Sequence, residues 1–125
     1  MQQHPTGDEL EFIKQYLEIP FLLDILEDNI TKMKGAEFRL GDIFLFHLVK
    51  LQDKLTLELA EIRKQMRNKG MKVIDTKRTK VEIRTKYLCR GYTGSMVLLL
   101  DRVKADLSMK LCELLSIDIN EMRSL

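Results

Sequence analysis

The sequence predicts a mainly α protein with a minor α+β character: a helical bundle of about four helices with one long helix and a small β-hairpin inserted before the last long helix. Apolar residues recur every three or four positions over most of the chain, which is typical of amphipathic helices. Between residues 81 and 90 the period shortens to two, which is typical of a half-buried strand. With 125 residues, 45% of them hydrophobic and 32% charged, residues 1–125 are expected to form a single helical domain.

The N-terminal third predicts two short helices. Residues 8–18 carry apolar side chains at helical spacing, namely Leu10, Ile13 and Leu17. Pro20 suits the first turn of a second helix, because the amide hydrogen that proline lacks is not needed there. This helix would bury a stripe of Leu22, Leu26, Ile30 and Met33 and end at Gly35. Residues 1–7 are expected to be flexible.

The longest predicted helix runs from residue 42 to residue 69, and Gly70 can close it in a left-handed conformation. Its apolar stripe advances by three or four residues per step and comprises Phe44, Leu48, Leu51, Leu55, Leu59, Ile62 and Met66. About 28 residues at roughly 1.5 Å each span roughly 42 Å, which is more than a small domain needs. We therefore expect a homodimer whose interface contains Phe44, Leu48, Leu51, Leu55, Leu59 and Ile62.

A second apolar face widens the surface of the same helix, most of all in its first two turns. It consists of Ile43, Leu45, Phe46, Val49 and Leu57. A helix that is apolar on two faces needs to be covered on more than one side.

Residues 71–90 are predicted to form the hairpin. The second strand alternates apolar with mostly charged residues, and the first strand is expected at residues 71–75 with the turn at residues 76–79. These turn residues lack the Gly, Asn or Asp that usually specifies a tight hairpin. A helix through the segment therefore stays open as an alternative, supported by a Glu82–Lys86 pair.

The last long helix is predicted from about residue 95 to residue 115. Its stripe has the same rhythm and comprises Met96, Leu100, Val103, Leu107, Leu111 and Leu114. We expect it to pack along the long helix. Residues 116–125 can add one further turn, with Ser116 or Asp118 as its cap.

The charge distribution is uneven along the chain. Residues 63–90 contain eleven Lys and Arg against two acids, whereas residues 1–62 contain six against twelve. The total charge of +2 hides this contrast. A local excess of positive charge can attract phosphates, anionic lipid or an acidic protein surface.

Four of these charges lie in the last turns of the long helix, where cations complement the helix dipole without any further role. The candidates for partner or phosphate binding lie beyond that helix and are Lys77, Arg78, Lys80, Arg84, Lys86 and Arg90. A basic hairpin of this kind can contact nucleic-acid phosphates. The interpretation that we favour is that it docks on the acidic half of a second copy or on a protein partner, because the long helix already points to self-association.

Gly91, Gly94 and Ser95 precede the predicted last helix and form a candidate anion site, because amides at a helix start can bind phosphate. The spacing is not that of a phosphate-binding P-loop. The favoured interpretation is a strand-to-helix turn in which Thr93 or Ser95 caps the helix.

The sequence offers no pattern of catalytic or metal-binding residues. The two histidines form no Glu-x-x-His pair, and the two cysteines, Cys89 and Cys112, belong to no CxxC motif. No nucleophile elbow is present. We therefore expect no enzyme activity, no metal and no cofactor, and two reduced cysteines. No apolar run is long enough for a membrane span, so a cytoplasmic protein is expected.

The run Tyr87-Leu88-Cys89-Arg90-Gly91-Tyr92, together with the helix that follows it, resembles small uncharacterised proteins of Gram-positive spore-forming bacteria. The resemblance covers about the last third of the chain and implies no activity. The function expected from the residues is a non-enzymatic interaction or regulatory module that self-associates through the long apolar helix and the basic hairpin. The alternative is a nucleic-acid-binding protein that contacts phosphates through residues 72–90.

Overall fold

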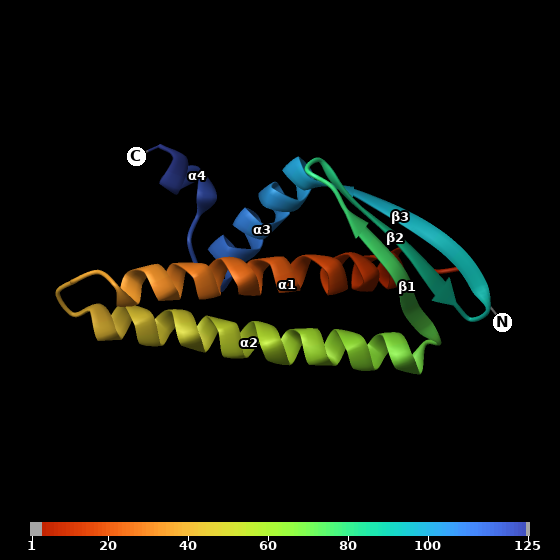
Figure 1. The fold of residues 1–125 in the computed structure, drawn as a ribbon, viewed down its shortest axis with the longest axis horizontal. Coiled ribbons are helices and arrows are strands. Elements are labelled where there is room, and N and C mark those ends of the chain that lie inside the picture. Colours follow the sequence, from red (N-terminus) through yellow and green to blue (C-terminus); the bar gives the residue numbers. More distant parts are fainter. Residues whose placement is uncertain (1–3, 125) are drawn as a thin grey trace.

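A computed structural model describes residues 4–124. In chain order the elements are α1 (Gly7–Lys34), α2 (Gly41–Asn68), β1 (Met71–Arg78), β2 (Glu82–Cys89), β3 (Tyr92–Leu99), α3 (Leu100–Leu114) and α4 (Ile119–Arg123). Figure 1 shows α1 and α2 side by side as an antiparallel helical hairpin, with the sheet at the end where α1 begins and α2 ends. The prediction of a mainly helical protein with a small β component is confirmed.

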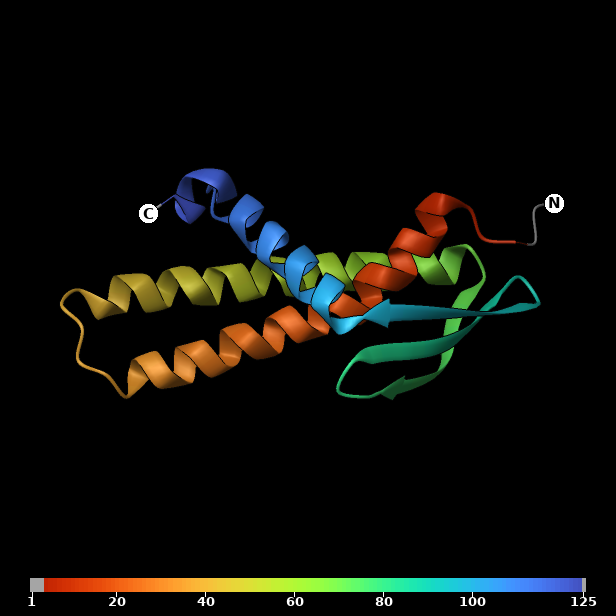
Figure 2. The ribbon, with the colours of Figure 1, turned by 90° about the horizontal axis from the view of Figure 1, so that it is seen from above.

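The N-terminal third forms one helix, so the prediction of two helices divided at Pro20 is wrong. Thr6 caps α1: its hydroxyl accepts a hydrogen bond from the Glu9 amide, and the Glu9 carboxylate accepts one from the Thr6 amide. Ile19 and Leu22, on either side of the proline, are buried in the core, and this packing outweighs the cost of a proline within a helix. Figure 2 shows α1 bending in its N-terminal half, as a proline causes.

The predicted flexible stretch at residues 1–7 overlaps the start of α1. Residues 1–3 lie outside the described residues, whereas Thr6 and Gly7 belong to the capped start of α1. The long helix is close to its prediction, because α2 covers residues 41–68 and Gly70 adopts a φ of +70° just after its end.

The β component is a three-stranded antiparallel sheet in the order β1-β2-β3, one strand more than the predicted hairpin. The turn between β1 and β2 is centred on residues 79–81, later than predicted, and the Thr79 hydroxyl accepts hydrogen bonds from the Val81 and Glu82 amides. Arg90 and Gly91 both have positive φ and form the tight turn between β2 and β3. An extra residue in β1, Ile74, makes a bulge between Val73 and Asp75.

The first five residues of the predicted last helix belong to β3 instead. Pairing with β2 along its whole length holds residues 92–99 extended, and the helix begins at Leu100. Apolar residues at 96–100 fit either structure locally, so the strand pairing decides between them. The short C-terminal helix is present as α4, and the Asp118 side chain caps it as one of the two predicted caps.

α3 follows β3 directly and crosses α1 on its way back over the helical hairpin (Figure 2). Its start is tied to the β1–β2 turn, because the Leu100 amide donates a hydrogen bond of 2.9 Å to the Val81 carbonyl. Val103 and Leu107 are its buried contacts with the core.

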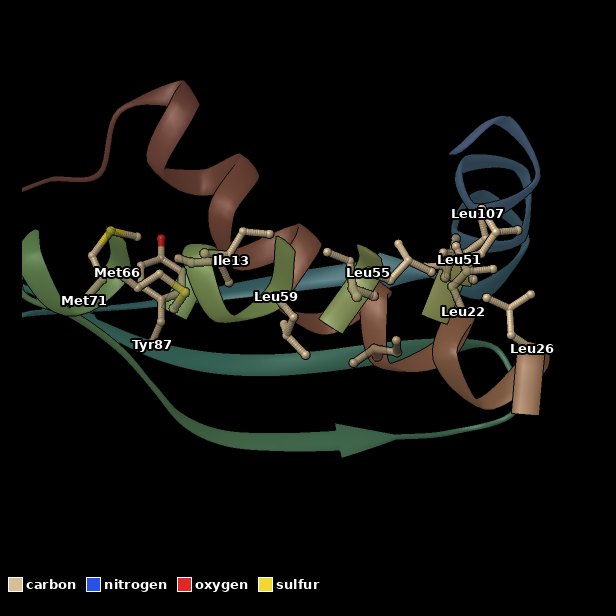
Figure 3. Close-up of a cluster of buried hydrophobic side chains, with 14 of the residues drawn as sticks. Ile13, Leu22, Leu26, Leu51, Leu55, Leu59, Met66, Met71, Tyr87 and Leu107 are labelled. Carbon is tan, nitrogen blue, oxygen red and sulfur yellow. The ribbon is translucent and has the colours of Figure 1, made fainter. Parts of the chain in front are cut away.

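The core runs along the seam between α2 and the elements that cover it, as Figure 3 shows from Met66 to Leu26. It contains Leu51, Leu55, Leu59 and Ile62, which are all buried within one chain. These four residues therefore cannot form the predicted dimer interface. Of the six predicted interface residues, Leu48 is half-buried and Phe44 alone is exposed. The argument from helix length also fails, because α1 has the same 28 residues as α2 and covers it.

Candidate functional site

The structure divides the six predicted basic site residues into two arginines that contact α1 and an external group. Residues that alternate along β2 point to opposite faces of the sheet, and Ile83, Thr85 and Tyr87 point inward to the core. Arg78 is the strand partner of Ile83, and its guanidinium lies 3.7 Å from the centre of the Phe21 ring on α1. Arg78 therefore stabilises the packing of the sheet on α1 by a cation–π contact.

Arg90 is the second arginine that contacts α1. Its guanidinium donates two parallel hydrogen bonds to Glu9, of 2.8 Å to Oε1 and 2.9 Å to Oε2. It also donates to the carbonyls of Lys69 and His4. Glu9 is buried, and these hydrogen bonds from Arg90, together with the one from the Thr6 amide, lower its pKa to about 2. One segment of the basic hairpin thus binds the acidic half of its own chain.

The external group lies on the outer face of the sheet, which faces away from the helices. Lys77, Arg84 and Lys86 line a shallow hollow of about 310 Å³ there, together with Asp75 and Ser95. Lys77 and Arg84 are directly opposite each other on neighbouring strands. We call these three basic residues and their hollow the basic face. Lys80 lies outside it, in the turn between β1 and β2.

Acidic residues offset part of the charge of the basic face. Arg84 Nε lies 2.9 Å from Glu82 Oε1, and Asp75 is the strand partner of Lys86. Two of the three cations therefore have an acidic neighbour, and the field of the basic face is much weaker than the charge of residues 63–90 predicts.

The residues of the predicted anion site do not lie at the start of a helix. Gly91 belongs to the β2–β3 turn, and Gly94 and Ser95 lie within β3. The helix whose amides would bind the anion begins five residues after Ser95, at Leu100. Gly94 has a packing role instead, because a Cβ at this position would lie 2.5 Å from the Tyr87 ring.

A second surface of interest lies at the far end of the helical hairpin, opposite the sheet (Figure 1). Five large apolar side chains within nine residues are 53–73% exposed there: Phe38, Leu40, Ile43, Phe44 and Phe46. We call these five residues the apolar tip. The sequence signalled three of them as the second or the main apolar face of the long helix, but Phe38 and Leu40 precede the predicted helix and were missed.

Two hollows adjoin the apolar tip. One of about 750 Å³ lies against the loop between α1 and α2 and is lined in part by Phe38, Leu40 and Ile43. The other, of about 420 Å³, lies between the two helices and the end of α3, where Phe44, Leu48 and Leu115 meet. The apolar tip is thus an uneven surface into which side chains of a partner can fit.

The described residues offer few candidates for a metal site or a reactive side chain. Among residues 4–124 no group of three or more His, Cys, Asp or Glu side chains is arranged to hold a metal ion. Cys89 and Cys112 are both free and buried, and burial raises the pKa of the Cys89 thiol. The helices of this part of the chain all lack the combination of length and apolarity that crossing a membrane requires.

Comparison with known proteins gives a family. Residues 4–119 match the family described as YhjD protein. The chain belongs to the YhjD protein family. No curated protein and no solved structure matches it. Membership of the YhjD family names no activity, and an origin of its members in spore-forming bacteria stays a prediction.

Proposed function

We propose that this protein is a non-enzymatic interaction module that forms a homodimer through the apolar tip. The observation that carries the proposal is the exposure of Phe38, Leu40, Ile43, Phe44 and Phe46 at the same end of the molecule. Large apolar side chains exposed close together are costly in water and mark interaction sites. The interface that we propose differs from the predicted one, since it uses the first turns of α2 and the preceding loop.

The area of the apolar tip suits a dimer. Large apolar side chains present roughly 150–250 Å² each, so five of them exposed by 53–73% leave roughly 600 Å² per copy. Two copies would bury roughly 1,200 Å², which is the lower end of the range for stable interfaces. A two-fold axis pairs the same patch from each copy, so apolar surface meets apolar surface.

The charges around the apolar tip also suit a second copy as the occupant. Arg39 lies in the same loop as Glu37, and Asp42 lies in the first turn of α2. In a two-fold arrangement Arg39 of one copy can lie opposite Glu37 or Asp42 of the other. The rim of the interface would then be complementary in charge.

The backbone of Leu40 adds independent support. This residue has a φ of 58° and is 73% exposed. A left-handed conformation is unfavourable for a bulky residue, and strained residues often mark functional positions. The exposed Leu40 side chain is accessible to a partner.

Light scattering coupled to size-exclusion chromatography tests the proposal. We expect a dimer of twice 14.7 kDa at micromolar concentration for the natural chain and a monomer for the Ile43→Ser/Phe46→Ser variant. Leu57→Ser is the matched control, because Leu57 is 72% exposed on the same helix but lies about three turns away from the patch. This control should stay dimeric. A monomeric natural chain, or a dimer that survives in the double variant, would contradict the proposal.

The basic face supports a second candidate function, the binding of nucleic-acid phosphates. The supporting observation is the cross-strand pair of Lys77 and Arg84, because like charges opposite each other destabilise a sheet. A phosphate between them would relieve the repulsion. The acidic neighbours of Arg84 and Lys86 make this the weaker candidate.

A salt titration separates this candidate from the first. We expect weak binding of labelled single-stranded RNA or duplex DNA at low salt, lost in Lys77→Glu/Lys86→Glu and kept in the control Lys54→Glu/Lys104→Glu, which reverses two exposed lysines elsewhere. Arg78 and Arg90 are left unchanged because they hold the fold together. If neither nucleic acid binds even at low salt, this second function is excluded.

A further inference from the structure

A partly buried charged cluster joins α3 to α1 at the place where the two helices cross. Glu18 of α1 is only 6% exposed, and Lys14 lies one turn before it. Lys14 Nζ is 2.9 Å from Asp106 Oδ2 on α3 and 3.9 Å from Glu18 Oε1. Two carboxyl groups thus share one ammonium group within the contact between the helices.

The cluster has too few hydrogen-bond donors for two ionised carboxylates. Glu18 Oε2 is buried and has no hydrogen-bond partner. Asp106 Oδ2 is also buried, and the donor close to it is the Lys14 ammonium at 2.9 Å. Arg102 reaches the other Asp106 oxygen only at 3.8 Å. A buried acceptor without a donor is costly, so a hydrogen on Glu18 Oε2 would stabilise the cluster.

The surrounding charges do not supply that hydrogen. Glu11 and Lys110 line the same hollow of about 210 Å³, together with Glu113. Lys110 is already engaged, because its Nζ lies 2.6 Å from Glu58 Oε1 on α2. Glu11 and Glu113 add negative charge and no donor. Among the charged side chains that face the cluster from α1 and α3, none donates a hydrogen bond to Glu18 Oε2.

We propose that Glu18 and Asp106 form a proton-dependent latch that holds α3 against α1. When Glu18 carries a proton, its hydroxyl donates a hydrogen bond to the Asp106 carboxylate, and Lys14 balances the one remaining charge. When Glu18 loses the proton, its buried carboxylate faces the half-buried Asp106 carboxylate and the latch weakens. This inference does not depend on the apolar tip, and it concerns how α3 is held.

The pH at which the latch responds follows from the surroundings of Glu18. Burial, together with the nearby Asp106, raises its pKa to about 7, and Lys14 opposes the shift. A detached α3 exposes Glu18 to water and returns its pKa to the ordinary value of 4.5. The closed state therefore binds more protons between pH 4.5 and 7. The contribution of the latch is complete below 4.5 and is lost as the pH rises through 7.

The limited burial of α3 makes this loss measurable. Among the described residues of the helix, Val103, Leu107 and Cys112 are fully buried, and Leu100, Leu111 and Leu114 are half-buried against the core. Its start is fixed to the sheet, so opening moves the rest of α3 away from α1. Local opening of this kind is what amide hydrogen exchange detects.

Hydrogen exchange of the α3 amides, corrected for the intrinsic rate at each pH, tests the latch on the full chain. We expect the opening constant to rise roughly tenfold per pH unit between about pH 5 and 6.5 and to level off above pH 7. Glu18→Gln mimics the protonated form and should show no such rise. Glu11→Gln, on an exposed residue of the same hollow, should keep it.

A second variant keeps the test decisive if Glu18→Gln perturbs folding. Asp106→Asn removes the anion that faces Glu18, so the rise should be smaller and should level off at a lower pH. Persistence of the unchanged rise in Glu18→Gln, or its loss in Glu11→Gln, would overturn the assignment. An α3 exchange rate that shows no pH dependence after correction in the natural chain would overturn it as well.

Discussion

Arg90 connects three parts of the chain that are far apart in sequence. Its side chain reaches the Glu9 carboxylate at the start of α1 and the Lys69 carbonyl at the end of α2, and its amide donates to the Gly70 carbonyl. A bidentate arginine–carboxylate pair that is largely removed from water is strong and specific in geometry. Arg90 is therefore a structural residue, and its place in a basic run of the sequence gives no hint of this.

The Glu9–Arg90 pair predicts a loss of stability in acid. Because the folded state lowers the pKa of Glu9 to about 2 from 4.5, the stabilisation is complete above pH 4.5 and is lost as the pH falls toward 2. Thermal unfolding followed by circular dichroism should show that Glu9→Gln lowers the Tm by several degrees at pH 7 and that the difference shrinks toward pH 2. Asp8→Asn, an exposed neighbour, should change little. An undiminished difference at pH 2 would show that the charge of Glu9 is unimportant.

At the scale of elements, the apolar stripe of α2 has an internal partner. Leu51, Leu55 and Leu59 pack into the core that α1 completes, and only the first turns of α2 extend beyond it. The periodicity of the stripe predicted burial correctly. It could not say whether another helix of the same chain or a second copy covers it, because both remove the same area from water.

Two leucines on α2 provide a matched test of this packing. Leu55 is 0% exposed and Leu57, two residues later, is 72% exposed. We expect Leu55→Ala to lower the free energy of unfolding by about 3 kcal/mol and Leu57→Ala to change it by less than about 0.5 kcal/mol. Urea unfolding at two protein concentrations measures both. A loss for Leu55→Ala no larger than that for Leu57→Ala would contradict the burial of Leu55 in the core.

At the scale of the whole molecule, the apolar tip and the sheet lie at opposite ends of the helical hairpin (Figure 1). Self-association through the apolar tip leaves the basic face of each copy free, so the two proposed surfaces can act at the same time. The latch between α1 and α3 lies between them. The long hairpin therefore separates an exposed apolar surface from a charged one.

Dimerisation at the apolar tip also predicts how thermal stability depends on concentration. Association stabilises the folded state by mass action, so the Tm of the natural chain should rise as the protein is concentrated. The Ile43→Ser/Phe46→Ser variant should show a constant Tm over the same range. Differential scanning calorimetry at several concentrations provides the measurement, and a constant Tm for the natural chain would argue against the dimer.

The sequence by itself determined the helical class, the extent of α2, the glycine that ends it and the strand character of residues 82–89. These follow from periods and end signals that lie within a few residues of one another. The continuity of α1 through Pro20 and the third strand did not follow from them. Local preference at Pro20 and at residues 95–99 is weaker than the packing and pairing that distant segments supply.

The tertiary structure alone decided which charges and apolar residues are left for a partner. Arg78 contacts Phe21 and Arg90 binds Glu9, so both arginines already have partners within the chain. The apolar tip is exposed because no described element covers the loop that follows α1. Whether a side chain can contact a partner depends on which residues pack against it in the folded chain. That information is absent from a single sequence, because contacts such as Glu9–Arg90 and Glu18–Asp106 join residues more than eighty positions apart.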